Sequence, residues 1–418
     1  MSCANVNSGP TNPSYVQFTD TAYDAFGRLR VSEPYTLFDS QNRYFADNQF
    51  DTSTATGGST TFLSNEATVR MDVTTSSGSE VVRQTYRSFP YQPGKSLLTL
   101  ETFTMNAAKT NLRQRVGFFN TQNGLFFQQN DSTLSFVLRS NSLPTPGTPS
   151  DIRTVTQANW NGDKLDGTGP SGVTLDVTKT QILFFDFEWL GVGRVRCGFF
   201  QDGQFIVCHT FDNENVQSSV YMTTAILPLR YEITNTGTTA SNSSMKQICS
   251  TVISEGGYAQ TSVEHVARMV NLSASNYLTT TFKPLVSIRL ASTALGAVVL
   301  PVNLNFLPST ADNFEIALIK NGTLTSASYT AVPSDSNVEY DISATAISGG
   351  TTLYNEWATG KTGRSIISSG TGYQWDLQLG ASLAGVSDVL TLVARTVTTG
   401  GAATGGGAGQ ISFYDLTQ

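Results

Sequence analysis

The stretch QILFFDFEWLGVGRVRCGFFQDGQFIVCHTF, residues 181–211, decides the fold class of this chain. Apolar side chains occupy every second position from Leu183 to Trp189, and a period of two is that of a β-strand. The intervening positions begin with another aromatic residue, Phe184, so both faces of the strand carry aromatic rings. Such a pattern is typical of a central strand in a two-layer β-sandwich.

The second half of this stretch predicts a β-hairpin. Asp202-Gly203 suits a type I′ turn, because both central residues of that turn need a positive φ. A two-residue turn at this point fixes the register of the two strands. In that register Phe199 faces Ile206 and Cys197 faces Cys208, all on the side expected to form the core.

Cys197 and Cys208 are therefore a candidate cross-strand pair, since directly opposed residues lie within disulfide reach. The alternative is two free thiols that fill one core layer as small apolar side chains. The chain has four cysteines in 418 residues and no CxxC spacing, which is too sparse for a disulfide scaffold. We favour free thiols in a reducing compartment.

The rest of the chain has the pattern of β-structure almost throughout. In VGFFNTQNGLFFQQ, residues 116–129, Asn123-Gly124 is again the kind of dipeptide that a type I′ turn prefers. Elsewhere Ser- and Thr-rich segments alternate with short aromatic and β-branched runs between Gly, Asn and Asp turns. The best helical periodicity lies at 262–271, where apolar residues share one face and predict a short connector helix.

The predicted fold is mostly β, with two sandwiches and an extended segment before them. The polar N-terminal part has short apolar islands and predicts an extended arm that packs on something else, or a small β layer. The strongest strand and turn signals follow it. The expected parts are an N-terminal arm at 1–95, a jelly-roll-like β-sandwich at 96–260, a connector at 261–280 and a C-terminal β-sandwich at 281–418.

The composition argues against several classes of function. Lys and Arg number 25 and Asp and Glu number 32, so the net charge is −7, and only 14% of residues are charged. Nucleic-acid binding needs clustered Lys and Arg, and membrane insertion needs about 20 consecutive apolar residues; the sequence has neither. The first ten residues show no secretory signal. The chain has two histidines, too few for metal sites or catalysis built on several His.

The loop WNGDKLDGTGPSG, residues 160–172, is a candidate contact site for a glycan or an ion. Asn161, Asp163 and Asp166 have oxygen atoms that could ligate Ca²⁺, although the spacing and distal Glu of an EF-hand are absent. Trp160 could stack on a sugar ring. The alternative, which we favour, is a structured turn with Asx-type hydrogen bonds, in which Trp160 anchors the loop to the sandwich.

Asp186 and Glu188 form a candidate catalytic pair on one face of the predicted strand. Their positions, two residues apart, place them roughly 6.5–7 Å from each other. This separation overlaps that of glycosidase carboxylates. Jelly-roll glycosidases of the laminarinase type carry three acids spaced E-x-D-x-x-E, and Phe184 stands here in place of the first. We therefore expect no enzyme activity, no catalytic residue, no metal and no cofactor.

Several longer stretches resemble virion structural proteins of marine tailed bacteriophages, cyanophages among them. TAYDAFGRLRVSEPYTLFDSQNRY, residues 21–44, is similar to an N-terminal module of those proteins. Segments 114–131, 160–211 and 227–233 resemble their β-sandwich module, and 284–350 is similar to their C-terminal β domain. Together the stretches cover most of the chain, and they carry no enzymatic motif.

The resemblance implies a non-enzymatic component of the virion, assembled in the host cytoplasm. Our first interpretation is a fibre-like appendage of the tail or neck, a homotrimer that contacts copies of itself, other virion proteins and a host-surface glycan. The alternatives are a protein that decorates the capsid surface, and a module that binds or cleaves glycans during adsorption. In the first interpretation the arm docks on the virion through Phe26, Arg28, Leu29, Tyr35 and Phe38.

Overall fold

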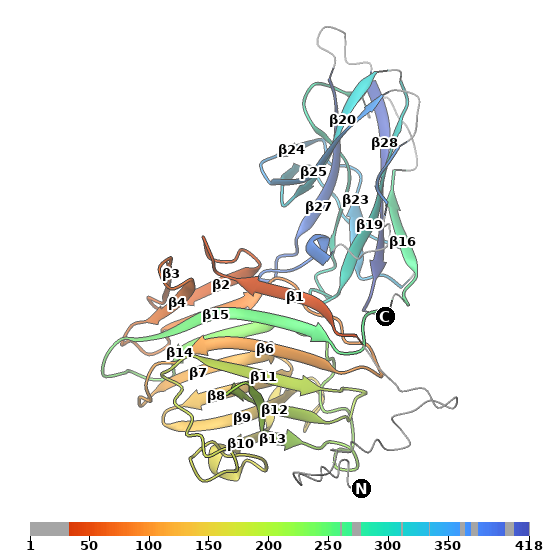
Figure 1. Ribbon diagram of the computed structural model, residues 1–418. Coiled ribbons are helices and arrows are strands. Elements are labelled where there is room, and N and C mark those ends of the chain that lie inside the picture. The colour runs from red at the N-terminus through yellow and green to blue at the C-terminus, as the bar shows by residue number, and fades with distance from the viewer. Residues whose placement is uncertain are drawn as a thin grey trace, which may run out of the picture.

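A computed structural model of the chain contains two β-sandwiches, one above the other (Figure 1). It describes residues 33–259, 261–269, 277–310, 312–333, 335–359, 364–368, 375–397 and 405–417. Within these ranges the regular elements are strands and two 3-10 helices, η2 (Gln157–Asn159) and η4 (Trp375–Leu377), which confirms the predicted mostly-β fold. No helix in the described ranges is long and apolar enough to cross a membrane.

The first sandwich packs an eight-stranded sheet against a seven-stranded sheet, and all strand pairs in both are antiparallel. In spatial order the eight-stranded sheet contains β13 (Gln204–Phe211), β12 (Val195–Gln201), β11 (Gln181–Phe187), β6 (Leu97–Thr104), β15 (Ser243–Ser254), β4 (Thr68–Val73) and β3 (Ser59–Leu63), and β1 (Tyr35–Gln41) pairs with β15. The seven-stranded sheet contains β10 (Ser150–Thr156), β9 (Thr133–Ser140), β8 (Gly124–Asn130), β7 (Leu112–Phe119), β14 (Leu229–Asn235), β5 (Glu80–Thr85) and β2 (Phe50–Ala55).

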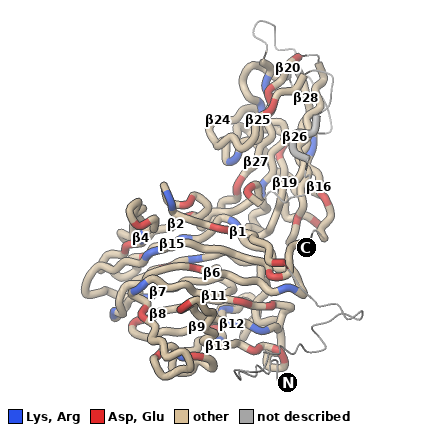
Figure 2. Tube along the Cα trace, viewed as in Figure 1, with Lys and Arg blue, Asp and Glu red and all other residues tan. Residues whose placement is uncertain are grey.

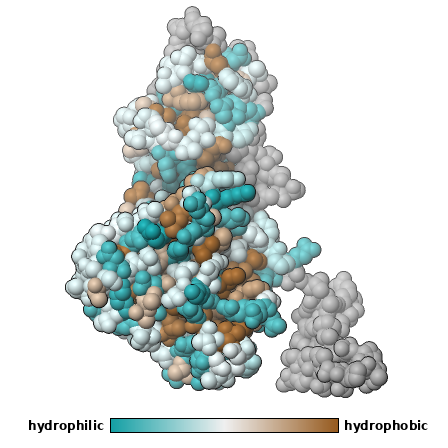
Figure 3. Space-filling view, turned by 60° about the vertical axis from the view of Figure 1, so that its left-hand side comes forward, coloured by the Kyte–Doolittle hydropathy of each residue, from teal (hydrophilic) through white to brown (hydrophobic). Residues whose placement is uncertain are grey.

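The core of the first sandwich lies between its two sheets and is rich in Phe. On β11, Leu183, Phe185 and Phe187 point into this core and are almost fully buried, as the alternation predicts. Because β11 pairs with both β12 and β6, it is an interior strand of the sheet. The face of the molecule seen in Figure 3 mixes polar residues with apolar patches.

The sandwich begins well before residue 96, which corrects the expected boundary of the N-terminal arm. Strands β1 to β5, within residues 35–85, belong to the two sheets, and Phe38 and Phe50 lie in the core. These strands are short, and β2 and β3 are rich in Ser and Thr, so their local pattern is weak. Pairing with β15 and β14 holds them in the sheets. Residues 1–32 lie outside the described part of the chain.

The two predicted hairpin turns have different outcomes. At Asp202-Gly203 both residues have positive φ, 50° and 78°, so this turn is confirmed. The turn predicted at Asn123-Gly124 is wrong, because Phe119 pairs with Gly124 and the loop covers residues 120–123. The Asn120 side chain accepts two backbone N–H groups within this loop, and these bonds favour the longer connection over the dipeptide turn.

The predicted pairing of Cys197 with Cys208 is wrong, because a β-bulge shifts the register between Cys197 and Gly198. Cys197 pairs with His209 instead. A Cβ atom at Gly198 would lie 1.9 Å from the carbonyl oxygen of Ile206, so only glycine permits this close approach. Both cysteines are buried and free, as we favoured, and burial raises the pKa of each thiol.

The second sandwich packs a five-stranded sheet against a six-stranded sheet. The five-stranded sheet contains β16 (Glu264–Arg268), β28 (Gly405–Asp415), β19 (Val299–Pro308) and β26 (Arg364–Ser368), and β17 (Tyr277–Leu278) pairs with β28. The six-stranded sheet contains β22 (Thr330–Ala331), β23 (Val338–Asp341), β18 (Lys283–Leu290), β27 (Val389–Thr396), β20 (Asn313–Lys320) and β25 (Thr351–Thr359). A separate hairpin pairs β21 (Thr323–Thr325) with β24 (Ala346–Ser348).

The connector helix predicted at 262–271 is wrong. Residues of this segment form β16, which pairs with β28 at the edge of the five-stranded sheet. Val263 and Val266, which were expected to share one apolar face of a helix, are exposed, and Ala267 lies in the core instead. Backbone pairing with β28 therefore outweighs the weak helical pattern.

The two sandwiches are joined through direct contacts. Val298, Leu300 and Trp375 of the second sandwich belong to the core cluster of the first. Arg87 Nη1 donates to the carbonyl oxygen of Trp375 at 2.5 Å, and Trp375 Nε1 donates to the Tyr35 hydroxyl at 2.9 Å. Two clefts, of about 610 and 430 Å³, lie beside these contacts.

Candidate functional site

The loop at 160–172 is anchored to the first sandwich by its first two residues. Trp160 is only 2% exposed, lies 4.7 Å from Phe136 between ring centroids, and donates from Nε1 to the carbonyl oxygen of Val155. Asn161 exchanges two hydrogen bonds with the backbone of Thr210 on β13. The Trp160 indole therefore faces the core and has no open face for a sugar ring.

The carboxylates of this loop hold its own backbone. Asp163 accepts the N–H groups of Leu165 and Ser171, and these bonds lower its pKa although burial alone would raise it. Asp166 accepts both the N–H and the hydroxyl of Thr168, which lowers its pKa. These are the Asx-type bonds of a structured turn. No group of three or more His, Cys, Asp or Glu side chains in the described ranges could hold a metal ion.

The acidic pair on β11 is divided between a strand and a loop. Asp186 lies on the outer face of β11 and forms an ion pair with Arg196 on β12. Glu188 lies beyond the end of β11, and its N–H donates to the carbonyl oxygen of Arg194. The pleat that would hold both carboxylates at a fixed separation therefore ends before Glu188.

The structure describes two of the five residues expected to dock the arm. Phe38 is buried in the first sandwich, 4.8 Å from Phe89 between ring centroids. The hydroxyl of Tyr35 accepts a hydrogen bond from Trp375 of the second sandwich. Both side chains thus contact this chain itself. Phe26, Arg28 and Leu29 lie outside the described residues.

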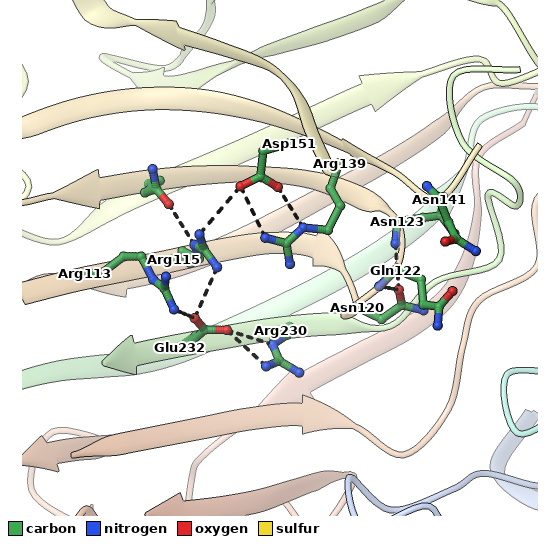
Figure 4. Close-up of polar contacts among 11 residues, drawn as sticks. Arg113, Arg115, Asn120, Gln122, Asn123, Arg139, Asn141, Asp151, Arg230 and Glu232 are labelled. Atoms are coloured by element: carbon green, nitrogen blue, oxygen red, sulfur yellow. Dashed lines mark hydrogen bonds and ion pairs between the residues drawn. The ribbon is translucent and has the colours of Figure 1, made fainter. Parts of the chain in front are cut away.

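A charged cluster that the sequence analysis did not single out lies on the outer face of the seven-stranded sheet (Figure 4). It arises because several of the residues of β7, β9 and β14 that alternate with core residues are charged. It contains four arginines and two acids: Arg113 and Arg115 on β7, Arg139 on β9, Arg230 and Glu232 on β14, and Asp151 on β10.

Glu232 holds three of the four arginines. Its Oε1 accepts from Arg113 Nη2 at 3.0 Å and from Arg115 Nη1 at 3.4 Å. Its Oε2 accepts from Arg230 Nε at 3.2 Å and Nη2 at 3.0 Å. Burial alone would raise the pKa of Glu232, but the three guanidinium groups lower it, so the carboxylate stays ionised.

Asp151 holds the fourth arginine and completes the network. Arg139 donates to it from Nε at 2.7 Å and from Nη2 at 3.3 Å, a bidentate pair. Arg115 Nη2 lies 3.8 Å from the same carboxylate, and its Nε donates to Gln128 Oε1 at 2.7 Å. Burial lowers the pKa of Arg115 to about 10, which still leaves it charged at neutral pH.

Two phenylalanine rings and a valine lie under these guanidinium groups. Phe119, Phe126 and Val137 form a separate buried cluster on the outer face of the sheet. The guanidinium carbons of Arg115 and Arg139 lie 5.0 and 5.1 Å from the ring centroid of Phe126, within cation–π range. We call the four arginines, the two acids and these three apolar residues the arginine face.

The arginine face has an excess of positive charge. Four arginines and two acids leave a local charge of +2 in a chain whose net charge is −7. Arg113 and Arg139 are its most exposed arginines, with side chains 26% and 16% exposed, against 9% for Arg115 and 10% for Arg230. Fixed guanidinium groups of this kind can bind carboxylate or sulfate groups through paired hydrogen bonds.

Asparagine side chains hold the β7–β8 loop beside this face (Figure 4). Asn123 Oδ1 accepts the N–H groups of Asn141 and Thr223, and its Nδ2 donates to the Thr223 hydroxyl at 2.7 Å.

The sequence contains a signal for the arginine face: two basic residues lie two positions apart in LRQRV, and Arg and Glu lie two positions apart in LRYEI. Alternation places these side chains on one face of their own strand but does not bring the strands together.

No known family model and no curated protein matches this chain. Solved structures resemble about half of it. The carbohydrate recognition domain of Emp47p is 13% identical, with 51% of this chain and 90% of that chain covered and a TM-score of 0.30. The legume lectin-like domain from Entamoeba histolytica is 10% identical, with 49% and 89% covered and a TM-score of 0.30. The CBM2 module of Lactobacillus casei BL23 phage J-1 evolved Dit is 6% identical, with 55% and 100% covered and a TM-score of 0.37.

Proposed function

We propose that this chain is a non-enzymatic adhesion component of a tailed-phage particle, and that it binds acidic glycans on the arginine face. The observation that carries the binding proposal is the excess of two positive charges, held in place by Glu232 and Asp151 above buried aromatic rings. The virion part of the proposal rests on the sequence resemblance at 21–44 and 160–211.

The geometry suits an acidic ligand for two physical reasons. Hydrogen bonds between a guanidinium and a carboxylate or sulfate are charge-assisted, and each contributes about 1.5–3 kcal/mol. The arginines are already fixed by Glu232, Asp151, Gln128 and Phe126, so binding loses little side-chain freedom.

Binding to polysaccharides that differ only in charge tests this proposal. We expect the protein to bind polygalacturonate and dextran sulfate, with neutral dextran bound much more weakly, and we expect added salt to weaken the binding. The double variant Arg113→Gln/Arg139→Gln should lose at least tenfold in affinity, since a tenfold loss corresponds to about 1.4 kcal/mol. These two arginines are the most exposed of the four, so their replacement disturbs the fold least.

Arg194→Gln is the matched control. It removes the same charge from an exposed ion pair with Asp212, away from the arginine face, and should leave the affinity unchanged. Equal binding of dextran and polygalacturonate, or an unchanged affinity in the double variant, would contradict the binding proposal.

A second observation favours assembly with copies of the same chain, as in an appendage. Strand β13 is the edge of the eight-stranded sheet, and its Phe205 is 51% exposed. Phe205 lies 5.1 Å from both Phe184 and Phe200 between ring centroids, so three aromatic rings meet at the outermost strand of this sheet. An exposed aromatic ring on an edge strand is a feature of protein interfaces.

Light scattering of the purified chain tests the assembly proposal. We expect a trimer, which Phe205→Ser converts to a monomer, whereas Leu307→Ser, an exposed apolar residue of the second sandwich, leaves the mass unchanged. A monomer at all concentrations would contradict it. In purified particles a low copy number supports a fibre-like appendage, and hundreds of copies support the alternative of a capsid-decorating protein.

A further inference from the structure

The second sandwich carries an exposed tryptophan on an open sheet face. Strand β25 is the edge of the six-stranded sheet, and its Trp357 is 60% exposed. The neighbouring Ala358 lies in the core, so alternation places Trp357 and Asn355 together on the outer face, and a β-bulge follows at Leu353. An indole has a flat apolar face and a polar edge, which suits contact with the C–H face of a pyranose ring.

The polar groups beside Trp357 are fixed and have no net charge. Glu315 on β20 is the cross-strand partner of Trp357 and is nearly buried. It accepts from Asn355 Nδ2 at 2.5 Å and from Arg395 Nε at 2.6 Å. The guanidinium of Arg395 also lies over the ring of Phe282, 4.5 Å from its centroid. Planar amide and guanidinium groups held in this way can pair with sugar hydroxyls.

The same strand leads into the cleft between the sandwiches. Thr351 and Leu353 line the cleft of about 430 Å³, together with Lys320, Asn321 and Gln378. Trp357 lies six positions after Thr351, which is roughly 20 Å along an extended strand. The strand is therefore long enough for a chain of several sugar rings to lie along it.

The cleft also combines balanced charge with an unused polar atom. Lys320 Nζ pairs with Asp388 at 2.9 Å, so these two charges cancel. Gln378 is 2% exposed; its Nε2 donates to the carbonyl oxygen of Ser88, and its Oε1 has no partner among the described residues. Figure 2 shows both blue and red positions around β25 and β27.

We propose that the outer face of β25, from Trp357 to the interdomain cleft, is a binding site for a linear neutral oligosaccharide. The site lies on a different sandwich from the arginine face, does not depend on the function proposed for that face, and takes a ligand without charge. Trp357 is the stacking residue, and Asn355 and Arg395 are the hydrogen-bonding residues. Leu353 and Thr351 line the entrance of the cleft.

Titration of the full chain with neutral oligosaccharides tests this site. The probes are the di- and hexasaccharides of the cello, laminari, malto and xylo series. Calorimetry and tryptophan fluorescence measure the binding of each probe. We expect one hexasaccharide series to bind at least tenfold more tightly than its disaccharide, because only the longer ligand spans both Trp357 and the cleft. Trp357→Ala should lower the hexasaccharide affinity at least tenfold, and Trp357→Phe should retain part of it.

Two further variants separate this site from a general effect on the protein. Leu353→Trp narrows the cleft entrance and should weaken the hexasaccharide but not the disaccharide. Tyr44→Ala removes a highly exposed aromatic residue of the first sandwich and should change neither affinity. Polygalacturonate binding should be unchanged in Trp357→Ala, so failure of one site does not imply failure of the other. No response to any neutral hexasaccharide, or full affinity in Trp357→Ala, would overturn the proposal.

Discussion

Glu101 is an acid in an unusual place, the core between the two sheets of the first sandwich. It lies on the core face of β6 between Thr99 and Phe103, and neither of its carboxyl oxygens has a partner among the described residues. Burial raises its pKa well above the usual range, because the apolar surroundings favour the neutral, protonated side chain over the charged one. Leaving a buried polar group without a partner typically destabilises a fold by about 1–3 kcal/mol.

Replacement of Glu101 by Gln should stabilise the protein near neutral pH and have little effect near pH 4. Above about pH 4.5 the unfolded chain releases the Glu101 proton while the folded state keeps it. Stability therefore falls as pH rises, by up to about 1.4 kcal/mol per pH unit, until the folded pKa is passed. Glutamine does not titrate, so the Glu101→Gln variant lacks this fall in stability with rising pH. Urea unfolding between about pH 4 and 8 measures the difference from the natural chain.

Glu66→Gln is the control for this change. Glu66 is an exposed acid paired with Lys246, and its replacement should leave the pH slope of stability as in the natural chain. Parallel stability curves for Glu101→Gln and the natural chain would show that Glu101 is not held neutral in the fold.

At the scale of elements, the β12–β13 hairpin shows how one glycine changes a register. The turn at Asp202-Gly203 starts the pairing as predicted, and Phe199 pairs with Ile206. At Gly198 the backbone of β13 comes so close that the pairing shifts by one residue beyond it. The bulge thus decides which residue faces Cys197, although the local alternation of β12 does not predict a bulge.

Gly198→Ala should destabilise the protein more than Gly203→Ala. At Gly203 a Cβ atom meets nothing within 4 Å, so only the positive φ of 78° opposes alanine, at a cost of about 1 kcal/mol. At Gly198 the Cβ would overlap the Ile206 carbonyl oxygen at 1.9 Å and approach Phe184 at 2.9 Å, so we expect about 2–3 kcal/mol. Chemical denaturation measures the free energy of unfolding of both variants. Equal losses of this free energy would contradict the role given to the bulge.

At the scale of the whole molecule, polar and apolar contacts hold the two sandwiches together. Besides the Arg87 and Tyr35 bonds to Trp375, Ala381 N–H donates to the carbonyl oxygen of Tyr86 at 2.9 Å, and Leu383 N–H donates to Asp51 at 2.6 Å. Because the apolar core cluster of the first sandwich also includes residues of the second, we expect the two units to unfold together.

Arg87→Met should uncouple the two sandwiches. The change removes bonds to the Trp375 carbonyl and to Gln49, and loss of a buried bond to a charged group costs about 1.5–3 kcal/mol. Calorimetry should show one transition for the natural chain and two for Arg87→Met. Arg289→Met, which breaks an ion pair inside the second sandwich, should keep one transition. A single transition in both variants would contradict the role given to Arg87 in holding the two sandwiches together.

The sequence by itself determined the β-structure, the buried face of β11 and the turn at Asp202-Gly203, because alternation and backbone preference act between neighbouring residues. Tertiary structure decided which strands became neighbours. It paired Glu264–Arg268 with β28 instead of leaving a helix, and moved the start of the sandwich to Tyr35.

The arginine face was decided in the same way. Arg113 and Glu232 lie 119 positions apart in the chain, and only the pairing of β7 with β14 brings them to 3.0 Å. The alternation of residues in the sequence predicts which side chains point outward from each strand. The free energy of packing two whole sheets selects the strand order, and that order determines which outward side chains meet.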